Sequence, residues 1–346
     1  MAALPAAPTA QALPDAPAVP GLAFRSIRGP EDAAALCAVH EGRRERDGVD
    51  PHSLLEGIPT PEYVRSVLSN AVEANQQDRW LVAQVGDQAA GYSRLASWYE
   101  MDGTWVYLAL GWVLPAWRGR GIGTAMLHWA EDRIRRLAAA EHPGERAEFA
   151  GNASATEHEA AALLLHEGYF VAYTVLEMGF ATSTPLPPPI LPAGLAVRPV
   201  QPEHVPLIAA GVCEAYAGEF EGNRFNQGDD PVGYARELSG PRHDPALWQV
   251  AWDGDQVAGQ VLVRLEDGRA ELFEVSVRPA WRRRGLGRAL LLHALRDLRA
   301  HGVEGIRLYT NDNFRTRAQD LYRSVGFRVL KEFPRYRKAF GPRQSP

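Results

Sequence analysis

Residues 277–288 read VRPAWRRRGLGR, and residues 113–124 read VLPAWRGRGIGT. The two stretches share the tetrapeptide Pro-Ala-Trp-Arg and four further positions, a valine, an arginine and two glycines, in the same register 164 residues apart. A repeat of this length exceeds the roughly 20 to 50 residues of a solenoid unit, so it indicates duplication of a whole globular domain. The sequence therefore predicts two tandem domains of the same fold.

The boundaries of these domains follow from composition. With 346 residues, 46% hydrophobic and 23% charged, the chain can build two cores of ordinary size. Residues 1–20 are mostly alanine and proline, which predicts a disordered tail. Five prolines between residues 181 and 194 predict a stiff linker. We therefore expect a first domain over residues 21–180 and a second over residues 195–346.

Several classes of protein are disfavoured by the composition. A formal net charge of -5 argues against nucleic-acid binding, which usually requires a basic face. No apolar run approaches the roughly 20 residues that cross a bilayer, and residues 1–20 lack the basic start of a signal peptide. Cys37 and Cys213 lie in separate halves, which favours reduced thiols over a disulfide. We expect a cytoplasmic monomer or homodimer with no nucleic-acid or membrane partner.

Each half shows the same order of patterns: a short strand, apolar helical segments, three strand-like runs, the arginine-glycine stretch and a helix. The strand-like runs cover residues 80–85, 89–97 and 104–113, and then 247–252, 256–265 and 269–277. Asp-Gly turns separate the later set, which predicts an antiparallel meander. The fold class is therefore α/β (α+β), with a mixed, largely antiparallel twisted sheet flanked by helices in each domain.

The arginine-glycine stretch joins a strand directly to a helix. Such a turn leaves several backbone N–H groups unpaired at the positive end of the helix dipole, so it can cradle an anion. Gly285 and Gly287 let a diphosphate approach the main chain, and the neighbouring arginines add positive charge. The alternative is a plain tight turn with solvated arginines. A dinucleotide fingerprint does not fit, because these glycines follow an antiparallel meander.

The chain resembles the GNAT superfamily of acetyltransferases. The resemblance is carried by Val-x-Pro (113–115 and 277–279), by Arg-x-x-Gly-x-Gly, and by Ala318-x-x-Leu321-Tyr322-x-x-x-Gly326-Phe327 in the second copy. It covers about 320 of the 346 residues. The tandem layout is similar to that of double-domain acetyltransferases of the mycothiol synthase type. The resemblance implies an acyltransferase that uses acetyl-CoA as co-substrate and needs no metal.

The resemblance also implies which residues hold the co-substrate. Two strands that part should receive the pantetheine arm, and loop amides should bind the pyrophosphate. In the second copy the matching positions are Val275, Ser276, Val277, Arg282, Arg283, Arg284, Gly285, Leu286, Gly287 and Arg288, with Asn313. Many relatives have an asparagine where this chain has Arg315, and Asn313 lies nearby. In the first copy the positions are Gly111, Trp112, Val113, Arg118, Gly119, Arg120, Gly121, Ile122, Gly123 and Thr124.

Acetyl transfer to an amine needs a base for the amine and an acid for the departing thiolate. Glu271 lies where several family members carry the base, and it shares side-chain parity with Val275. Glu274 or a water chain is the alternative base. Tyr322 matches the family's proton donor, the alternative being a core tyrosine.

The first copy has Leu164 where the second has Tyr322, and Tyr107 where the second has Glu271. We therefore expect the N-terminal domain to bind CoA weakly, or to help shape the substrate site, without efficient turnover.

The function expected from these residues is acetyl transfer from the CoA thioester to a primary amine of a small molecule or peptide. The alternative is a non-catalytic acyl-CoA-binding or sensing protein, which would need neither Glu271 nor Tyr322. Five acidic residues could favour a cationic amine or simply form a solvated face. They are Glu214, Glu219, Glu221, Asp229 and Asp230.

Overall fold

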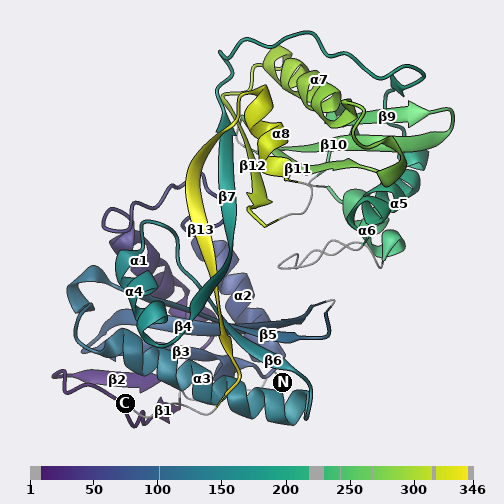
Figure 1. Cartoon of the computed structure of the whole chain (residues 1–346). Coiled ribbons are helices and arrows are strands. Elements are labelled where there is room, and N and C mark those ends of the chain that lie inside the picture. The colour runs from purple at the N-terminus through teal and green to yellow at the C-terminus, as the bar shows by residue number, and fades with distance from the viewer. Residues whose placement is uncertain are drawn as a thin grey trace, which may run out of the picture. The chain divides into compact units, whose positions relative to one another are not determined.

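The computed structural model describes residues 9–100, 102–217, 230–241, 243–266, 268–313 and 317–341. The chain forms two compact units. Unit 1 comprises Met1–Tyr173 and Phe333–Pro346, and unit 2 comprises Thr174–Glu332. Each unit has a mixed, mostly antiparallel sheet with helices on both faces (Figure 1). The fold class predicted from the sequence is confirmed.

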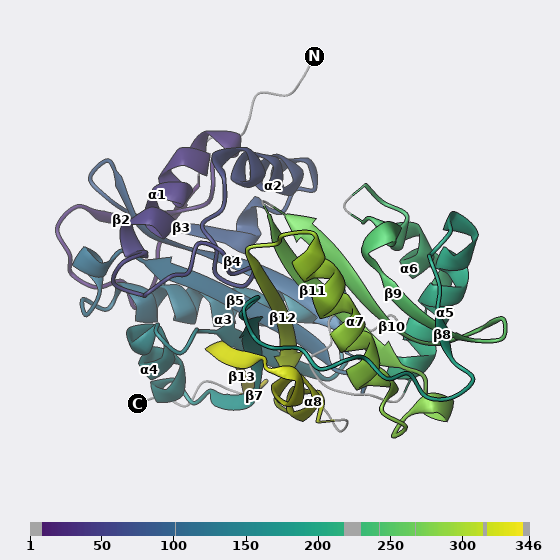
Figure 2. The same cartoon turned by 90° about the horizontal axis from the view of Figure 1, so that it is seen from above.

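Unit 1 is built on strands in the order β1-β2-β3-β4-β5-β6-β13, of which β5 and β6 pair in parallel. Helices α1 and α2 cover one face, and α3 and α4 the other (Figure 2). Phe149, Tyr107 and Ile134 are among the largest fully buried side chains. The strands are β1 (Ala10–Gln11), β2 (Leu22–Arg25), β3 (Trp80–Val85), β4 (Gln88–Tyr99), β5 (Trp105–Val113), β6 (Ala147–Asn152) and part of β13 (Arg328–Ala339). The helices are α1 (Ala33–Arg43), α2 (Pro61–Glu73), α3 (Ile122–Glu141) and α4 (His158–His166).

Unit 2 repeats this plan with strands in the order β7-β12-β11-β10-β9-β8, of which β11 and β12 pair in parallel. Helices α7 and α8 cover one face of the sheet, and α5 and α6 the other (Figure 1). The strands are part of β7 (Phe170–Phe180), then β8 (Ala196–Val197), β9 (Gln249–Asp253), β10 (Gln256–Glu266), β11 (Arg269–Val277) and β12 (Gly305–Asn311). The helices are α5 (Val205–Tyr216), α6 (Pro231–Leu238), α7 (Leu286–Ala300) and α8 (Ala318–Val325).

The helix that follows each arginine-glycine loop forms as its spacing predicts. Apolar residues recur every four positions along α7, and all of them are buried against the sheet: Leu286, Leu290, Ala294 and Leu298. The residue before each helix is a glycine in the left-handed region, with φ of 82° at Gly121 and 85° at Gly285. A residue with a Cβ is strained in that region, so the glycine sets the start of each helix.

The units differ from the domains expected from the sequence in two segments. Residues 174–180 of β7 belong to unit 2, where they pair antiparallel with β12 from Phe180–Ile306 to Val175–Asn311. Residues 335–339 of β13 belong to unit 1, where they pair antiparallel with β6. Each unit therefore takes one strand from the half of the sequence that otherwise builds the other unit. Strand patterns give burial but not the partner strand, so the sequence does not reveal this exchange.

The part of the tail that the structure describes, from Thr9 on, is packed on unit 1. Ala10 and Gln11 pair with β2, and Leu13 packs against the core of unit 1. Asp15 Oδ2 lies 2.7 Å from His128 Nδ1. The sequence predicts disorder here because large apolar side chains are scarce, but backbone pairing and one leucine anchor the segment instead.

In the part of the chain that the structure describes, no helix is both long and apolar enough to span a membrane. Within the same residues no three His, Cys, Asp or Glu side chains gather as metal ligands would. Cys37 and Cys213 are not joined in a disulfide, and Cys213 is buried.

Candidate active site

The candidate site lies in unit 2, where the parallel strands β11 and β12 separate. Their pairing runs only from Arg269–Gly305 to Glu271–Arg307. From Leu272 onward β11 leaves β12, whereas β12 continues to pair with β7 on its other side. The separation leaves one edge of residues 272–277 without a neighbouring strand. This separation of β11 and β12 lies where the family resemblance implies that two strands part.

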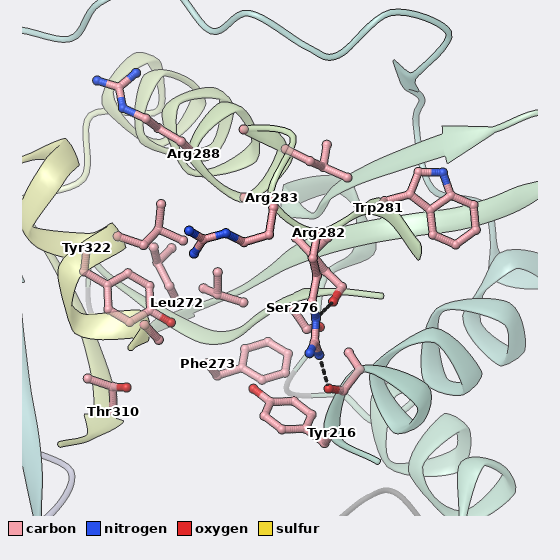
Figure 3. Close-up of a pocket in the computed structure, with 18 of the residues that line it drawn as sticks. Tyr216, Leu272, Phe273, Ser276, Trp281, Arg282, Arg283, Arg288, Thr310 and Tyr322 are labelled. Atoms are coloured by element: carbon pink, nitrogen blue, oxygen red, sulfur yellow. Dashed lines mark hydrogen bonds between the residues drawn. The ribbon is translucent and has the colours of Figure 1, made fainter. Parts of the chain in front are cut away.

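A cavity of about 840 Å³ fills this separation (Figure 3). Its lining comes from the end of α5, from β11, from the arginine-glycine loop, from β12 and from α8. Its lining residues include Tyr216, Phe273, Ser276, Arg282, Arg283, Gly285, Gly287, Arg288, Thr310 and Tyr322. Its volume is that of an ordinary small-molecule site, for which about 300–1,000 Å³ is typical.

At one end of the cavity the helix α7 begins without a side-chain cap. Gly285 stands at the N-cap position and has no side chain that could accept from the first amides of the helix. A Cβ built on Gly285 would meet no atom within 4 Å, whereas one on Gly287 would lie 3.2 Å from Leu321 Cδ2. Exposed amides at the positive end of a helix dipole suit a phosphate group. The residues present therefore fit the diphosphate of a nucleotide carrier.

The arginines of this loop have different tasks. Arg282 donates from Nε to the Val277 carbonyl at 2.9 Å and from Nη2 to the Ala215 carbonyl, so it holds the loop against the end of α5 (Figure 3). Arg283 extends into the cavity towards Tyr322 (Figure 3). Arg288 lines the cavity from the first turn of α7, whereas Arg284 is not among the lining residues.

Arg283 adopts a backbone conformation that is rare for a residue with a side chain. Its φ is 61°, in the left-handed region, and the matching residue of the first copy is Gly119 with φ 69°. This conformation costs an ordinary residue roughly 1–2 kcal/mol. The second copy has an arginine in this conformation despite the energetic cost, and the side chain of Arg283 lines the cavity.

Glu274 is buried beside the cavity, with 5% of its surface exposed. Burial raises the pKa of its carboxyl from 4.5 to about 7, while hydrogen bonds from Ser276 and Tyr216 act in the opposite direction. Both of these donors line the cavity, but Glu274 itself does not. Within the described residues, its Oε1 atom has no hydrogen-bond partner. A carboxyl that titrates near neutral pH can accept a proton and release it again.

Glu271, the other carboxylate proposed from the sequence, faces away from this cluster. Its Oε2 lies 3.1 Å from Nη1 of Arg264 on β10, and it is not among the cavity-lining residues. A β-bulge separates the two carboxylates, because Leu262 pairs with Glu274 whereas Val263 pairs with Leu272. Phe273 is the extra residue of this bulge, and its ring lines the cavity (Figure 3).

Tyr322 projects from α8 into the wall of the cavity and is 6% exposed (Figure 3). Burial raises its pKa, and the nearby carboxyl of Glu274 raises it further. The phenol therefore keeps its proton at neutral pH. The helix that carries it ends at Gly326, which has φ 110° and forms the cap predicted from the sequence.

The remaining residues proposed from the sequence lie around this centre. Val275 and Val277 line the cavity from β11, and Leu286 lines it from α7. Asn313 follows β12 and does not line the cavity, and Arg315 lies outside the described residues. Glu214 forms an ion pair with Arg278, with Nε 2.8 Å from Oε2.

The other acidic residues named from the sequence add little. Asp230 caps α6 by accepting from the Gly233 amide at 2.7 Å. The remaining three, Glu219, Glu221 and Asp229, lie outside the described residues.

The first copy lacks this set of polar groups. Counting 164 residues back, Leu110 stands in place of Glu274 and Trp112 in place of Ser276. Leu164 packs so closely on β6 that a Cβ on Gly151 would lie 2.7 Å from its Cδ2. The loop also differs, because Arg118 donates two hydrogen bonds to the buried carboxylate of Asp47 at 2.6 and 2.8 Å.

The glycine loop of the first copy is also approached by the tail. Pro17 Cβ lies 3.2 Å from the position that a Cβ on Gly121 would occupy. The other residues proposed there, Gly111, Val113, Gly119, Arg120, Ile122, Gly123 and Thr124, lie at the end of β5, in the loop and in the first turn of α3. Tyr107 is buried in the core and is 1% exposed.

Comparison with known proteins supports this interpretation of the fold. The family model for the Acetyltransferase (GNAT) family matches residues 51–147 and 210–327, one stretch in each half. A mycothiol acetyltransferase of Clavibacter michiganensis subsp. michiganensis is 33% identical over 232 residues, which are 65% of this chain and 70% of that protein. A mycothiol acetyltransferase of Thermobispora bispora is 29% identical over 311 residues, which are 86% of this chain and 93% of that protein.

Two solved structures share the fold. The structure of a GCN5-related N-acetyltransferase from Sphaerobacter thermophilus gives a TM-score of 0.73 at 24% identity, covering 97% of this chain and 99% of that one. A tandem GNAT protein from the clavulanic acid biosynthesis pathway gives a TM-score of 0.62 at 16% identity, covering 93% of this chain and 100% of that one. With a GNAT match in each half, the chain belongs to the GNAT acetyltransferase family of acyltransferases, in its tandem two-domain form.

Proposed function

We propose that unit 2 transfers the acetyl group of acetyl-CoA to the primary amine of a small molecule or peptide. The observation that carries this proposal is the meeting of three features at one cavity. These are the uncapped start of α7 at Gly285, the Tyr322 hydroxyl, and the Ser276 and Tyr216 hydroxyls that hold Glu274. A binding protein without transfer chemistry would not need a carboxyl that titrates near neutral pH beside a buried phenol.

In the proposed reaction the loop holds the donor and two side chains move protons. Acetyl-CoA supplies a thioester whose carbonyl carbon accepts the amine and whose leaving group is a thiolate. Glu274, as carboxylate, takes the proton of the acceptor ammonium through the Tyr216 hydroxyl or a water molecule, because Glu274 itself lies behind the cavity lining. The neutral amine forms the new C–N bond, the C–S bond breaks, and Tyr322 gives its phenolic proton to sulfur. The amide nitrogen then loses its second proton, which returns to the Tyr322 phenolate directly or through water.

Glu274 fits the role of base better than Glu271. The Glu271 carboxylate is already neutralised by Arg264 and lies outside the lining. A guanidinium partner stabilises the charged form of a carboxylate and weakens it as a base. Glu274 has two hydroxyl donors and, within the described residues, no ion pair with an arginine or lysine, so it remains able to accept a proton near neutral pH.

We propose that unit 1 does not transfer acetyl groups. It has Leu110 and Leu164 where unit 2 has Glu274 and Tyr322, and neither leucine can exchange a proton. In the loop of unit 1, Arg118 is also engaged in an ion pair with Asp47. A role for unit 1 in shaping the acceptor site, in the cytoplasmic monomer or homodimer expected from the sequence, stays a prediction.

Two measurements test the function. Calorimetry with acetyl-CoA and CoA should give one binding event per chain, and absence of any heat of binding would overturn the proposal. Thiol release should then depend on an acceptor amine from a panel of small amines, amino acids, aminoglycosides and peptides. Because relatives are named mycothiol acetyltransferases, the acceptor of those enzymes belongs in the panel. Binding without acceptor-dependent thiol release would favour the alternative, an acyl-CoA-binding protein.

A further inference from the structure

A buried glutamine lies behind the carboxyl that we propose as the base. Gln260 of β10 is directly opposite Ser276 of β11 in the strand register, and it is 0% exposed. Its Nε2 lies 2.6 Å from the Ser276 hydroxyl oxygen. Ser276 lies two residues after Glu274 on the same face of β11, and its hydroxyl acts on the Glu274 carboxyl as a hydrogen-bond donor that lowers the pKa of that carboxyl. These three polar side chains form a chain from the interior to the proposed base.

The direction of the hydrogen bonds in this chain follows from the donors available. When the Gln260 amide nitrogen donates to Ser276, the hydroxyl oxygen is occupied as an acceptor, so its own proton is free to point to Glu274. An ionised carboxylate can only accept, and this arrangement supplies it with a donor. The opposite amide orientation would draw the serine proton to Gln260 and would leave Glu274 to donate as a neutral acid.

Among the described residues, Gln260 Oε1 has no hydrogen-bond partner, and a Cβ built on Gly211 of α5 would lie 3.6 Å from it. A buried acceptor without a partner costs on the order of 1–3 kcal/mol. The residue is therefore not explained by its contribution to stability alone.

Among the described residues, the titratable groups whose pKa values Glu274 affects are tyrosines. Tyr216 of α5 donates to it, and Tyr234 of α6 and Tyr322 of α8 lie near enough for its charge to raise their pKa values. Burial raises the pKa of all three, so they stay neutral in the range where Glu274 titrates. Ser276 and Tyr216 thus act as hydrogen-bond donors to the Glu274 carboxylate.

We propose that Gln260 is a positioning residue for the transfer reaction: its amide turns the Ser276 hydroxyl proton towards Glu274 and so keeps that carboxyl ready to accept a proton. This inference rests on the proposed function. The first copy supports it, because the strand pair that corresponds to Gln260 and Ser276 is Tyr92 and Trp112. Tyr92 Oη lies 2.6 Å from His40 Nε2 there, and Leu110 replaces the carboxyl. The glutamine and the serine are present only in the copy that has the carboxyl.

The test is the pH dependence of kcat/KM in Gln260→Met, which keeps most of the volume and removes the amide. The acidic limb should move to higher pH, with kcat/KM about three- to tenfold lower near pH 6.5 and within about twofold of the parent near pH 9. Gln256→Met, at the exposed start of the same strand, is the matched control and should leave the profile unchanged. A loss by the same factor at every pH would mean a packing role only and would overturn the inference.

A second pair of variants tests whether Gln260 acts through Ser276. Ser276→Ala should move the limb in the same direction, Ser276→Thr should restore it, and Gln260→Met should have no further effect in the Ser276→Ala background. A shift from Gln260→Met that persists in that background would contradict the inference. If Gln260→Met does not fold, the contrast between Ser276→Ala and Ser276→Thr decides it.

Glu274→Gln separates the two proposals. If this variant keeps the activity and the acidic limb of the parent, the proposed base is wrong and the proposed mechanism fails. If it loses both while Gln260→Met keeps the parent profile, only the role of Gln260 fails.

Discussion

The carboxylate of Glu271 lies 3.1 Å from the guanidinium of Arg264, directly across the strand pair β11–β10. Glu271 is therefore already paired, and we expect Glu271→Gln to keep kcat/KM within about threefold of the parent. Glu274→Gln should lose about 10²–10⁴-fold, the range of a general base. Initial-rate measurements of thiol release check both. An equal loss in the two variants would contradict this assignment.

The stability of the fold should also depend on Glu274. Its folded pKa of about 7 lies above the ordinary value of 4.5, so the folded state binds more protons between these pH values. The contribution of Glu274 to the free energy of unfolding is then fully present below about pH 4.5 and is lost as pH rises through 7.

The substitution Glu274→Gln removes the titrating carboxyl and therefore removes this loss of stability at high pH. The variant should melt at a higher temperature than the parent at pH 8, and the difference should shrink towards pH 5. Thermal melts at both pH values test this, and a lower melting temperature of the variant at pH 8 would contradict it.

Removing the Tyr322 hydroxyl should slow transfer without weakening binding. In Tyr322→Phe the ring still packs against Phe327, with centroids 6.1 Å apart in the parent. We expect kcat to fall about 10²-fold, while the affinity for acetyl-CoA by calorimetry changes by less than about twofold. Tyr336→Phe, in the core of unit 1, is the control and should leave kcat unchanged. An unchanged rate in Tyr322→Phe would remove this residue from the mechanism.

Replacing Arg283 by the residue of the first copy should separate stability from binding. Arg283→Gly relieves a left-handed backbone conformation, so unfolding should become harder by roughly 1 kcal/mol. The same change removes a guanidinium from the cavity, and the affinity for acetyl-CoA should fall about five- to tenfold. Denaturant unfolding and calorimetry measure the two effects. A weaker fold with unchanged affinity would contradict this prediction.

Arg118, the loop arginine of the first copy that matches Arg282, should affect stability but not binding. Arg118 pairs with Asp47, whose side chain is 1% exposed. Arg118→Ala would remove two hydrogen bonds from that carboxylate, which keeps Arg43 as a partner at 3.1 Å, at a cost of roughly 1.5–3 kcal/mol in the free energy of unfolding. Denaturant unfolding of unit 1 should reveal this loss, while calorimetry should find the affinity of unit 2 for acetyl-CoA unchanged. An equally stable variant would show that the pair is not structural.

Much of the fold could be predicted because it depends on patterns among residues that are close together in the sequence. The repeat at Gly121 and Gly285 gave the duplication, and the period of four residues from Leu286 gave α7 and its buried face. The loop at Gly285 could be predicted because a glycine between a strand and an apolar helix has few other uses. These features depend on neighbours in the sequence, which a single sequence displays directly.

The details of the site depend on contacts that are distant in the sequence. The parity argument that favoured Glu271 counts residues along one strand, and the bulge at Phe273 breaks the register with β10. Tyr216 is separated from Glu274 by 58 residues, and no sequence signal joins the two. A raised pKa comes from burial by several elements at once, which a pattern along one strand does not reveal.

The exchange of β7 and β13 has a consequence for how the protein matures. Cutting the chain within residues 181–194 would yield an N-terminal fragment without β13 and a C-terminal fragment without β7, so neither product would own a complete sheet. Synthesis proceeds from the N-terminus, and domains usually fold in that order. Here unit 1 must wait for residues 335–339, whereas unit 2 has its whole sequence once residue 332 has emerged. The unit with the proposed catalytic groups can therefore fold first, and β13 then completes unit 1.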